Sequence, residues 1–325
     1  MFGKFMNNYY YGKAGKGDYR KEDLPRTRWQ LFWEMLRVRF SGLVQLNLIT
    51  ALAWLPTMYV ISLLVNGVYG FAEAASIVAA DSANATAEQL LLWENRQAFF
   101  SALTMRTLLY LAPCIALTGP LQAGMAHVTR NWARDEHAFI WADFKEGVKE
   151  NWKQGLGVSI ITGLVPLMVF LGWQVYGQLG AQSALFVPLQ MITLLVGILW
   201  MMAVTFMYPL MVGYRLPFGA LLRNALLLAV GRLPHTAGVR LVMLVPTLIA
   251  AAFAFLVPGY ALYALMALAG YYLLIGNALA RFVYASFSNA AFDRFINPRI
   301  EGAQVDRGLA PQDDLEEDDE EESQA

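Results

Sequence analysis

The chain has 325 residues, of which 57% are hydrophobic and 15% are charged. Soluble domains average roughly 25% charged residues, so the composition excludes an ordinary soluble domain and favours a membrane protein. The formal net charge of −1 hides nine acids within residues 313–322, so the rest of the chain carries about +8. Most of these bases flank apolar segments, which predicts contact with anionic lipid headgroups and gives no indication of nucleic acid.

Residues 1–40 are predicted to form a cytoplasmic arm followed by a helix at the membrane surface. Residues 1–23 are rich in Gly, Tyr and Lys and show no periodicity. From Pro25, a residue tolerated in a first helical turn, Trp29, Phe32, Leu36 and Phe40 recur every three or four positions. Aromatic and basic residues in this pattern are typical of an interfacial helix.

Residues 41–286 are predicted to form an all-α, polytopic membrane domain. A helix of about 20 apolar residues crosses a bilayer. By that measure six spans are expected, at about residues 42–64, 107–128, 155–176, 185–208, 239–256 and 260–282. The acids scattered through residues 66–105 predict an outer loop there, and residues 287–325 read as a cytoplasmic, acidic, disordered tail.

The distribution of Lys and Arg predicts the orientation of these spans. The N-terminal arm, the two connections at 130–153 and 215–240 and the C-terminal region hold 22 of the 24 bases. The opposite side has only Arg96 and Arg106. Because cytoplasmic loops are enriched in Lys and Arg, both termini are expected in the cytoplasm.

The charged connection between the second and third spans is the best candidate for binding a partner protein. Five charged or aromatic residues in it are the candidates for this contact: Asp143, Lys145, Lys149, Trp152 and Lys153. The lysines recur every four residues, which places them on one face of an amphipathic helix. Such a charged rim could hold a partner's cytoplasmic segment. The competing interpretation is a solvated helix whose charges pair with one another.

Several short motifs of this chain resemble the YesL-like family of bacterial integral membrane proteins, whose molecular function is unknown. They are Leu46-Asn47-Leu48, Trp54-Leu55-Pro56, Thr118-Gly119-Pro120 with Gly124, Asp143-Phe144-Lys145, Lys149 and Asn151-Trp152-Lys153-Gln154. The resemblance implies a multi-pass protein of the bacterial plasma membrane, linked to carbohydrate uptake. It implies no catalytic residue. The outer segment 66–105 and the acidic tail depart from the family's compact form.

Uncharged polar side chains within the spans have two possible roles. Asn47, Gln190 and Asn277, with Gln174, could line a substrate path or hydrogen-bond between helices. The spans contain no securely placed Asp, Glu or Lys, which proton- or ion-coupled transporters usually need.

No motif of an enzyme or cofactor site is recognisable. The three histidines, His127, His137 and His235, are not spaced for a shared metal, and the single Cys114 excludes an intramolecular disulfide. Asp135, Glu136 and Asp143 could form an acid pair for hydrolysis, but neighbouring bases favour a charge-paired helix. No phosphate-binding loop or dinucleotide fingerprint occurs. We therefore expect no enzyme activity and no cofactor.

Two functional expectations follow. The first is a non-enzymatic accessory or permease-like component that contacts a membrane transporter subunit in carbohydrate uptake. The alternative is an autonomous transporter or channel for a small uncharged solute.

Overall fold

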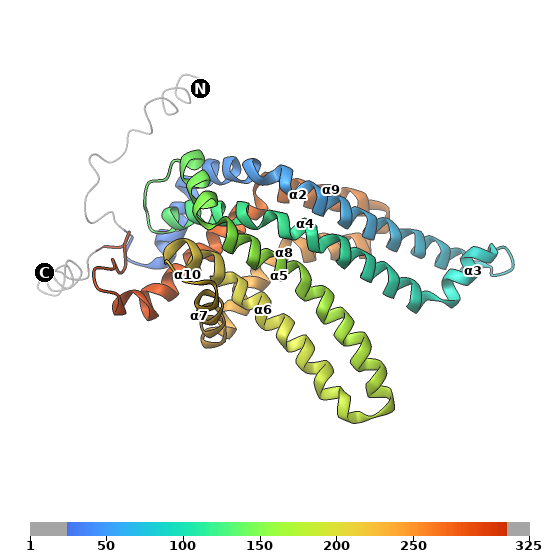
Figure 1. Cartoon of the computed structure of the whole chain (residues 1–325). Coiled ribbons are helices and arrows are strands. Elements are labelled where there is room, and N and C mark those ends of the chain that lie inside the picture. Colours follow the sequence, from blue (N-terminus) through green and yellow to red (C-terminus); the bar gives the residue numbers. More distant parts are fainter. Residues whose placement is uncertain (1–24, 311–325) are drawn as a thin grey trace, which may run out of the picture.

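A computed structural model describes residues 25–310, and this part of the chain is all-α (Figure 1). The main helices are α2 (Arg28–Ala80), α3 (Ala87–Glu94), α4 (Arg96–Ala133), α5 (Ile140–Gln182), α6 (Val187–Gly213), α7 (Phe218–Gly231), α8 (Leu233–Leu256), α9 (Ala261–Tyr271) and α10 (Asn277–Phe295). A π-helix, Tyr272–Gly276, joins α9 to α10, and short 3₁₀ turns lie at Ala184–Phe186, Pro258–Tyr260 and Asn297–Arg299.

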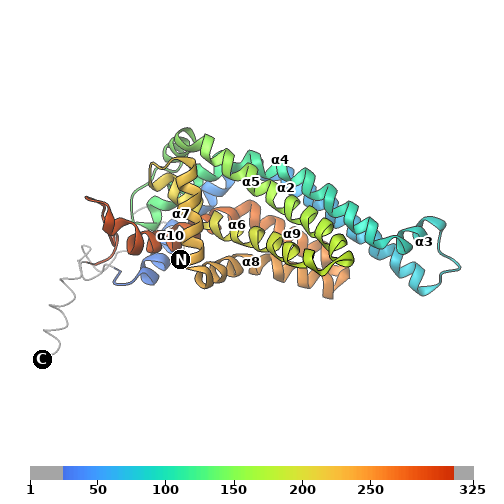
Figure 2. The ribbon, with the colours of Figure 1, turned by 60° about the horizontal axis from the view of Figure 1, so that its bottom comes forward.

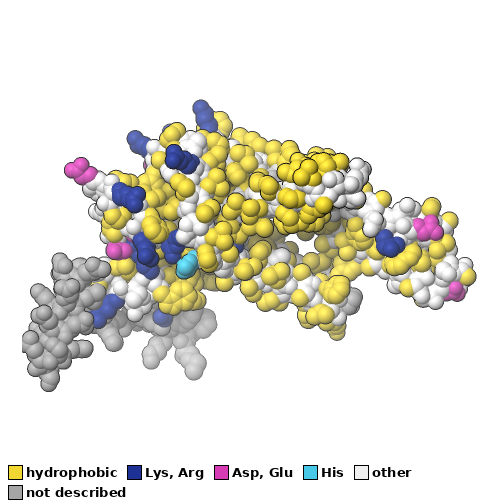
Figure 3. All heavy atoms as spheres, turned by 90° about the horizontal axis from the view of Figure 1, so that it is seen from below, with side chains coloured by type: hydrophobic (Ala, Val, Ile, Leu, Met, Phe, Trp, Pro, Cys, Tyr) yellow, Lys and Arg dark blue, Asp and Glu magenta, His cyan; other side chains and the backbone are white. Residues whose placement is uncertain are grey.

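Six helices within the described residues are long and apolar enough to cross a membrane. At most 28% of the most apolar stretch of each is buried inside the structure. Large apolar surfaces of this kind require an apolar environment. Hydrophobic side chains accordingly cover the middle of the molecule, whereas Lys and Arg gather toward one end (Figure 3). The prediction of an all-α polytopic fold is confirmed.

The first helix differs from the prediction at both of its ends. The expected interfacial helix and first span form one continuous helix of 53 residues, begun by Thr27 and Gln30 in a reciprocal capping box. At 1.5 Å per residue α2 is about 80 Å long, well beyond a hydrocarbon core of about 30 Å.

The expected outer loop at 66–105 is replaced by a helical hairpin. The Ala-rich end of α2 keeps its helix to Ala80, since Ala is the strongest helix former, and α3 and α4 follow after a short turn. The Phe71 ring stacks on Phe99 at 5.6 Å and meets Phe100 edge-on at 4.7 Å. These ring contacts join α2 to α4 at the end farthest from α10 (Figure 1).

The prediction that residues 287–325 form a disordered tail is wrong for the first part of that range. Residues 287–295 continue α10, and the segment up to Ala310 packs back on the start of α2. Arg28 pairs with Asp293 and with Asp306, the latter at 2.5 Å, and Ala310 N donates to the Pro25 carbonyl at 3.1 Å. The N-terminal arm up to residue 24 and the acidic run at 313–322 lie outside the described residues.

Helices α4 and α5 pack with unusually close backbones. A Cβ atom built on Gly119 would lie 2.1 Å from Ser159 Oγ and 2.3 Å from the Gly155 carbonyl oxygen. Close approach through small residues is the usual way to pack membrane helices, because lipid supplies no hydrophobic drive for their association. The pair fixes the geometry of α5, which then diverges with α6 from the rest of the bundle (Figures 1 and 2).

Candidate functional site

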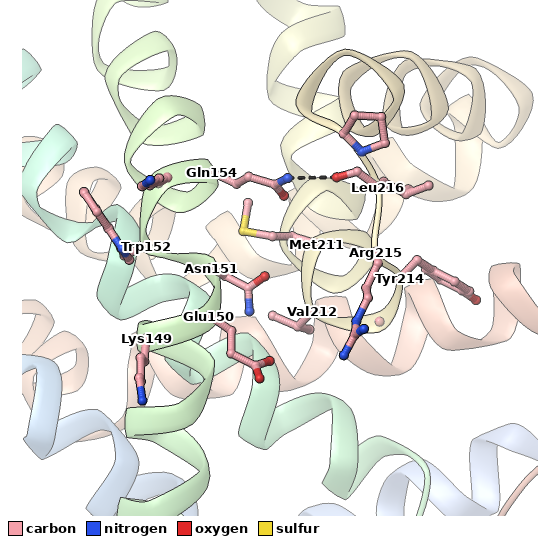
Figure 4. Close-up of a pocket in the computed structure, with 13 residues that line it drawn as sticks. Lys149, Glu150, Asn151, Trp152, Gln154, Met211, Val212, Tyr214, Arg215 and Leu216 are labelled. Carbon is pink, nitrogen blue, oxygen red and sulfur yellow. Dashed lines mark hydrogen bonds between the residues drawn. The ribbon is translucent and has the colours of Figure 1, made fainter.

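A polar groove lies where the first third of α5 faces the end of α6. Residues 149–154 form one wall and residues 211–217 the other, enclosing about 830 Å³. Figure 4 shows Glu150 and Asn151 on the α5 wall and Arg215 on the opposite wall. The Gln154 side-chain amide donates to the Leu216 carbonyl at 2.8 Å and ties the two walls together.

Three of the five predicted docking residues, Lys149, Trp152 and Lys153, lie on the α5 wall of this groove. Figure 4 shows the side chains of Lys149 and Trp152 turned away from the α6 wall, whereas Glu150, Asn151 and Gln154 point toward it. The Trp152 ring is 46% exposed, and the Lys153 ammonium lies 5.6 Å from its centroid. Lys145 lies one turn earlier, 5.9 Å from the Trp141 ring, and lines a neighbouring cleft instead.

Asp143 has a local structural role. Its Oδ2 accepts a hydrogen bond of 2.9 Å from the backbone N–H of Phe139, and Phe139 is the N-cap residue of α5. A carboxylate in the first turn also suits the helix dipole. Asp143 therefore begins the helix that carries the groove and does not itself line the groove.

A hydrogen-bonded network holds the α6 wall of the groove against the end of α10. The Tyr214 hydroxyl donates to Asn297 Oδ1 at 2.5 Å, and the Asn297 amide donates to Asp293, which also pairs with Arg28. Burial raises the pKa of Tyr214 to about 12. The phenol thus stays protonated, and remains a donor, at physiological pH.

Glu136, one of the acids of the α4–α5 connection, is paired with arginines. Glu136 pairs with Arg134 at 2.9 Å and with Arg307 at 3.3 Å, as a charge-paired connection would. Among residues 25–310, no three His, Cys, Asp or Glu side chains gather where they could hold a metal ion.

The predicted intramembrane amides bond to backbone carbonyls. Asn47 donates to the carbonyls of Tyr272 at 2.9 Å and Leu273 at 2.7 Å, and its Oδ1 accepts the Ala278 N–H at 2.9 Å. Asn277 also donates to the Tyr272 carbonyl, at 3.3 Å. A π-helix leaves the regular hydrogen-bond ladder, so Asn47 supplies the partners that this segment would otherwise lack.

Gln190 lies apart from these two residues. Its amide donates to the Trp173 carbonyl at 3.2 Å, between α6 and α5. Gln174 likewise binds Ser101 Oγ, at 2.6 Å. The predicted polar residues therefore do not converge on a single path.

Sequence reasoning missed a pair of arginines inside the bundle, Arg240 of α8 and Arg281 of α10. Arg240 Nε donates to Thr205 Oγ1 at 2.8 Å, and its guanidinium lies 4.8 Å from the Tyr284 ring centroid. The Arg281 guanidinium lies 4.2 Å from the ring of Tyr208. In the sequence the two arginines mark the ends of an uncharged stretch, as boundary residues of spans do. The one signal against that interpretation is that no other charged residue follows Arg281 until Asp293.

An apolar cleft of about 480 Å³ begins beside Arg240. It is formed by residues of α5, α6, α8, the π-helix and α10, among them Val169, Ile198, Leu244 and Tyr284. The polar groove and the apolar cleft are thus two separate concave sites that share α5 and α6 as walls.

Comparison with known proteins adds one finding. The profile of a family described as "Protein of unknown function, DUF624" matches residues 97–173, about a quarter of the chain. No curated protein and no solved structure matches the chain. The matched segment covers α4 and most of α5, so it includes the close α4–α5 contact and the α5 wall of the polar groove. The chain is therefore similar, over this helix pair, to an uncharacterised family.

Proposed function

We propose that this protein is a non-enzymatic membrane component of YesL-like type that binds a transporter subunit through the polar groove. The observation that carries the proposal is the polar groove itself, whose α5 wall also carries the exposed Lys149, Trp152 and Lys153. Arg215 lies opposite, and Glu150 is the one acid among the lining residues. The proposed occupant is therefore an acidic, amphipathic helical segment of a transporter's membrane subunit.

The form of the groove supports this occupant. An exposed tryptophan beside a cation offers the aromatic anchor and charged rim that recur in protein interfaces. The Gln154–Leu216 and Tyr214–Asn297 hydrogen bonds fix both walls before binding, which lowers the entropic cost of association. The link to carbohydrate uptake rests on the family resemblance alone.

The proposal places the protein in the bacterial plasma membrane with both termini in the cytoplasm. The start of α2 and the end of α10 lie at the same end of the bundle (Figure 1). The polar groove, built by the start of α5 and the end of α6, belongs to the segments with the excess of Lys and Arg. A cytoplasmic groove would face a transporter's cytoplasmic segments.

An autonomous transporter of an uncharged solute has less support. Such a protein needs polar groups that offer free hydrogen bonds along a path. The candidate path residues instead donate to backbone carbonyls. Asn47 and Asn277 do so at the π-helix, and Gln190 does so between α5 and α6.

The test is a mild-detergent pull-down of the tagged full-length protein from its native membrane, with mass spectrometry of the recovered proteins. We expect stoichiometric recovery of a transporter subunit. Charge reversal in the groove, Lys149→Glu with Lys153→Glu, should abolish that recovery because it repels an acidic segment. The matched control is Arg223→Glu, an exposed charge on α7 outside the groove. Recovery of this chain alone, or a partner retained by the groove variant, would contradict the proposal.

A further inference from the structure

The arginine pair lacks the counter-charge that a buried cation needs. Within residues 25–310 the ion pairs with carboxylates involve Arg28, Arg134 and Arg307, and none reaches Arg240 or Arg281. Arg240 and Arg281 contact Thr205 and Tyr208, which lie one helical turn apart on α6. Two unpaired positive charges inside a bundle are costly, and a bound anion would offset that cost.

Both arginines also have a buried N–H group without a hydrogen-bond acceptor. Arg240 Nη2 and Arg281 Nη1 are fully buried, and neither has an acceptor within the described chain. The rings of Tyr284 and Tyr208 stabilise the charges through their π faces, but a ring face accepts no strong hydrogen bond from these N–H groups. The missing group is therefore an acceptor with negative charge, such as a phosphate or carboxylate oxygen.

The apolar cleft beside Arg240 indicates that the anionic group belongs to a ligand with an apolar body. The cleft holds about 480 Å³, which is within the usual range for ligand pockets, and Arg240 is the one charged residue among its lining. Ile198 and Leu244 on its walls are 46% and 47% exposed, on surfaces that face the bilayer. A ligand with one anionic end and an apolar body matches this layout and can enter sideways from the membrane.

The depth of Arg240 fits the headgroup of a phospholipid. Arg240 follows the first residue of α8 by seven positions, which is about 10 Å along the helix at 1.5 Å per residue. The interfacial zone on each side of a bilayer is roughly 5–7 Å thick. With the first residue of α8 placed at the membrane surface, the Arg240 backbone lies a few ångströms below the boundary between headgroups and acyl chains, which is within reach of a headgroup drawn toward the bundle.

We propose that Arg240, which lines the apolar cleft, binds the anionic headgroup of a membrane phospholipid whose acyl chain occupies that cleft, and that the nearby Arg281 adds to the positive charge that attracts the headgroup. This lipid site is independent of partner binding in the polar groove. It gives the cationic pair its counter-charge and fills the space between α6, α8 and α10.

The experiment measures retained lipid by native mass spectrometry. The full-length protein is reconstituted in equimolar phosphatidylglycerol and phosphatidylcholine and then released from the bilayer. Wild type should retain phosphatidylglycerol in preference to phosphatidylcholine. Arg240→Gln should lower that preference about tenfold, since it removes a charge-assisted hydrogen bond. Arg281→Gln should lower it less, since it removes only a nearby positive charge. Arg223→Gln, an exposed arginine on α7, is the matched control and should leave the preference unchanged.

A second variant leaves both charges intact. Ile198→Trp fills the cleft from its exposed wall and should also lower retention, because the acyl chain loses its space. If the arginine variants fail to fold, the lipid retained by Ile198→Trp still tests whether an acyl chain occupies the cleft. Equal retention of both lipids by wild type, or unchanged retention in Ile198→Trp, would overturn the proposal. Excess inorganic phosphate should not displace the lipid; displacement would instead identify a site for free phosphate.

Discussion

At the scale of single residues, Asn47 shows how one side chain can make an irregular backbone tolerable inside a membrane domain. It is fully buried and contacts three backbone groups around the π-helix. In hydrocarbon no water is present to satisfy such groups. The same amide that reads in the sequence as a candidate path residue is thus committed to joining α2 to the π-helix and α10.

Asn47→Ala should destabilise the protein by about 1–3 kcal/mol, because it leaves two carbonyls and one N–H without this partner. The measurement is denaturant-induced unfolding in detergent, followed by helical circular dichroism. Asn66→Ala is the matched control, since Asn66 lies exposed on the same helix. Equal stability of the two variants would show that the π-helix does not depend on Asn47.

The arginine pair belongs to the same scale and explains the main omission of the sequence interpretation. A basic residue next to an apolar stretch is usually a boundary residue, and the positive-inside count treats it as one. Whether its side chain turns outward or into the bundle depends on neighbouring helices. Here Thr205 and Tyr208 of α6 receive the two guanidiniums, and nothing in the local sequence of α8 or α10 specifies that contact.

At the scale of elements, the α4–α5 pair is the most constrained contact. Its glycines allow two helices to touch backbone to backbone, and the family match covers this same pair. The contact orients α5, and α5 supplies one wall of both concave sites. A change in α4 that moves α5 should therefore disturb sites that α4 does not line.

Gly119→Ala should destabilise the protein by about 1–3 kcal/mol, the usual cost of overpacking, because the new methyl group collides with Ser159 and the Gly155 carbonyl. Gly70→Ala is the control: it also lies in a helix, and its Cβ would meet nothing within 4 Å. Gly70→Ala should be neutral or stabilising, since Ala is the better helix former. Thermal unfolding in detergent distinguishes the two, and a stable Gly119→Ala variant would contradict the tight contact.

At the scale of the whole molecule, the described chain has a charged end and an apolar body. A network of Arg28, Asp293, Tyr214 and Asn297 joins the start of α2 to the ends of α6 and α10, and Arg134 pairs with Glu136 in the α4–α5 connection beside it. The α2–α4 hairpin extends away from this end (Figure 1). Such polarity suits a protein that crosses a bilayer and presents its charged end to one side.

Labelling of single cysteines tests the orientation. In a Cys114→Ser background, Ser82→Cys lies in the turn between α2 and α3, and Glu146→Cys lies on the exposed face of α5 at the other end. We expect a membrane-impermeant maleimide to label Ser82→Cys in intact cells and Glu146→Cys only after permeabilisation. The reverse pattern would place the termini outside and would remove the basis for a cytoplasmic partner.

The sequence alone determined the class of this protein, because the composition and length of apolar stretches depend on no tertiary contact. It also determined the helical character of the docking segment, since the spacing of Lys145, Lys149 and Lys153 is a local property. The prediction of a loop at residues 66–105 was wrong. It rested on the scattered acids, whereas the many alanines of this segment favour helix.

Only the tertiary structure decided which side chains meet. It assigned Asp143 to the start of α5, placed Glu150 and Asn151 opposite Arg215 (Figure 4), and turned Asn47 toward the π-helix. It also brought Arg240 of α8 and Arg281 of α10 to neighbouring positions on α6, at Thr205 and Tyr208. Contacts of this kind arise from the packing of distant helices, and periodicity within one helix carries no information about its neighbours.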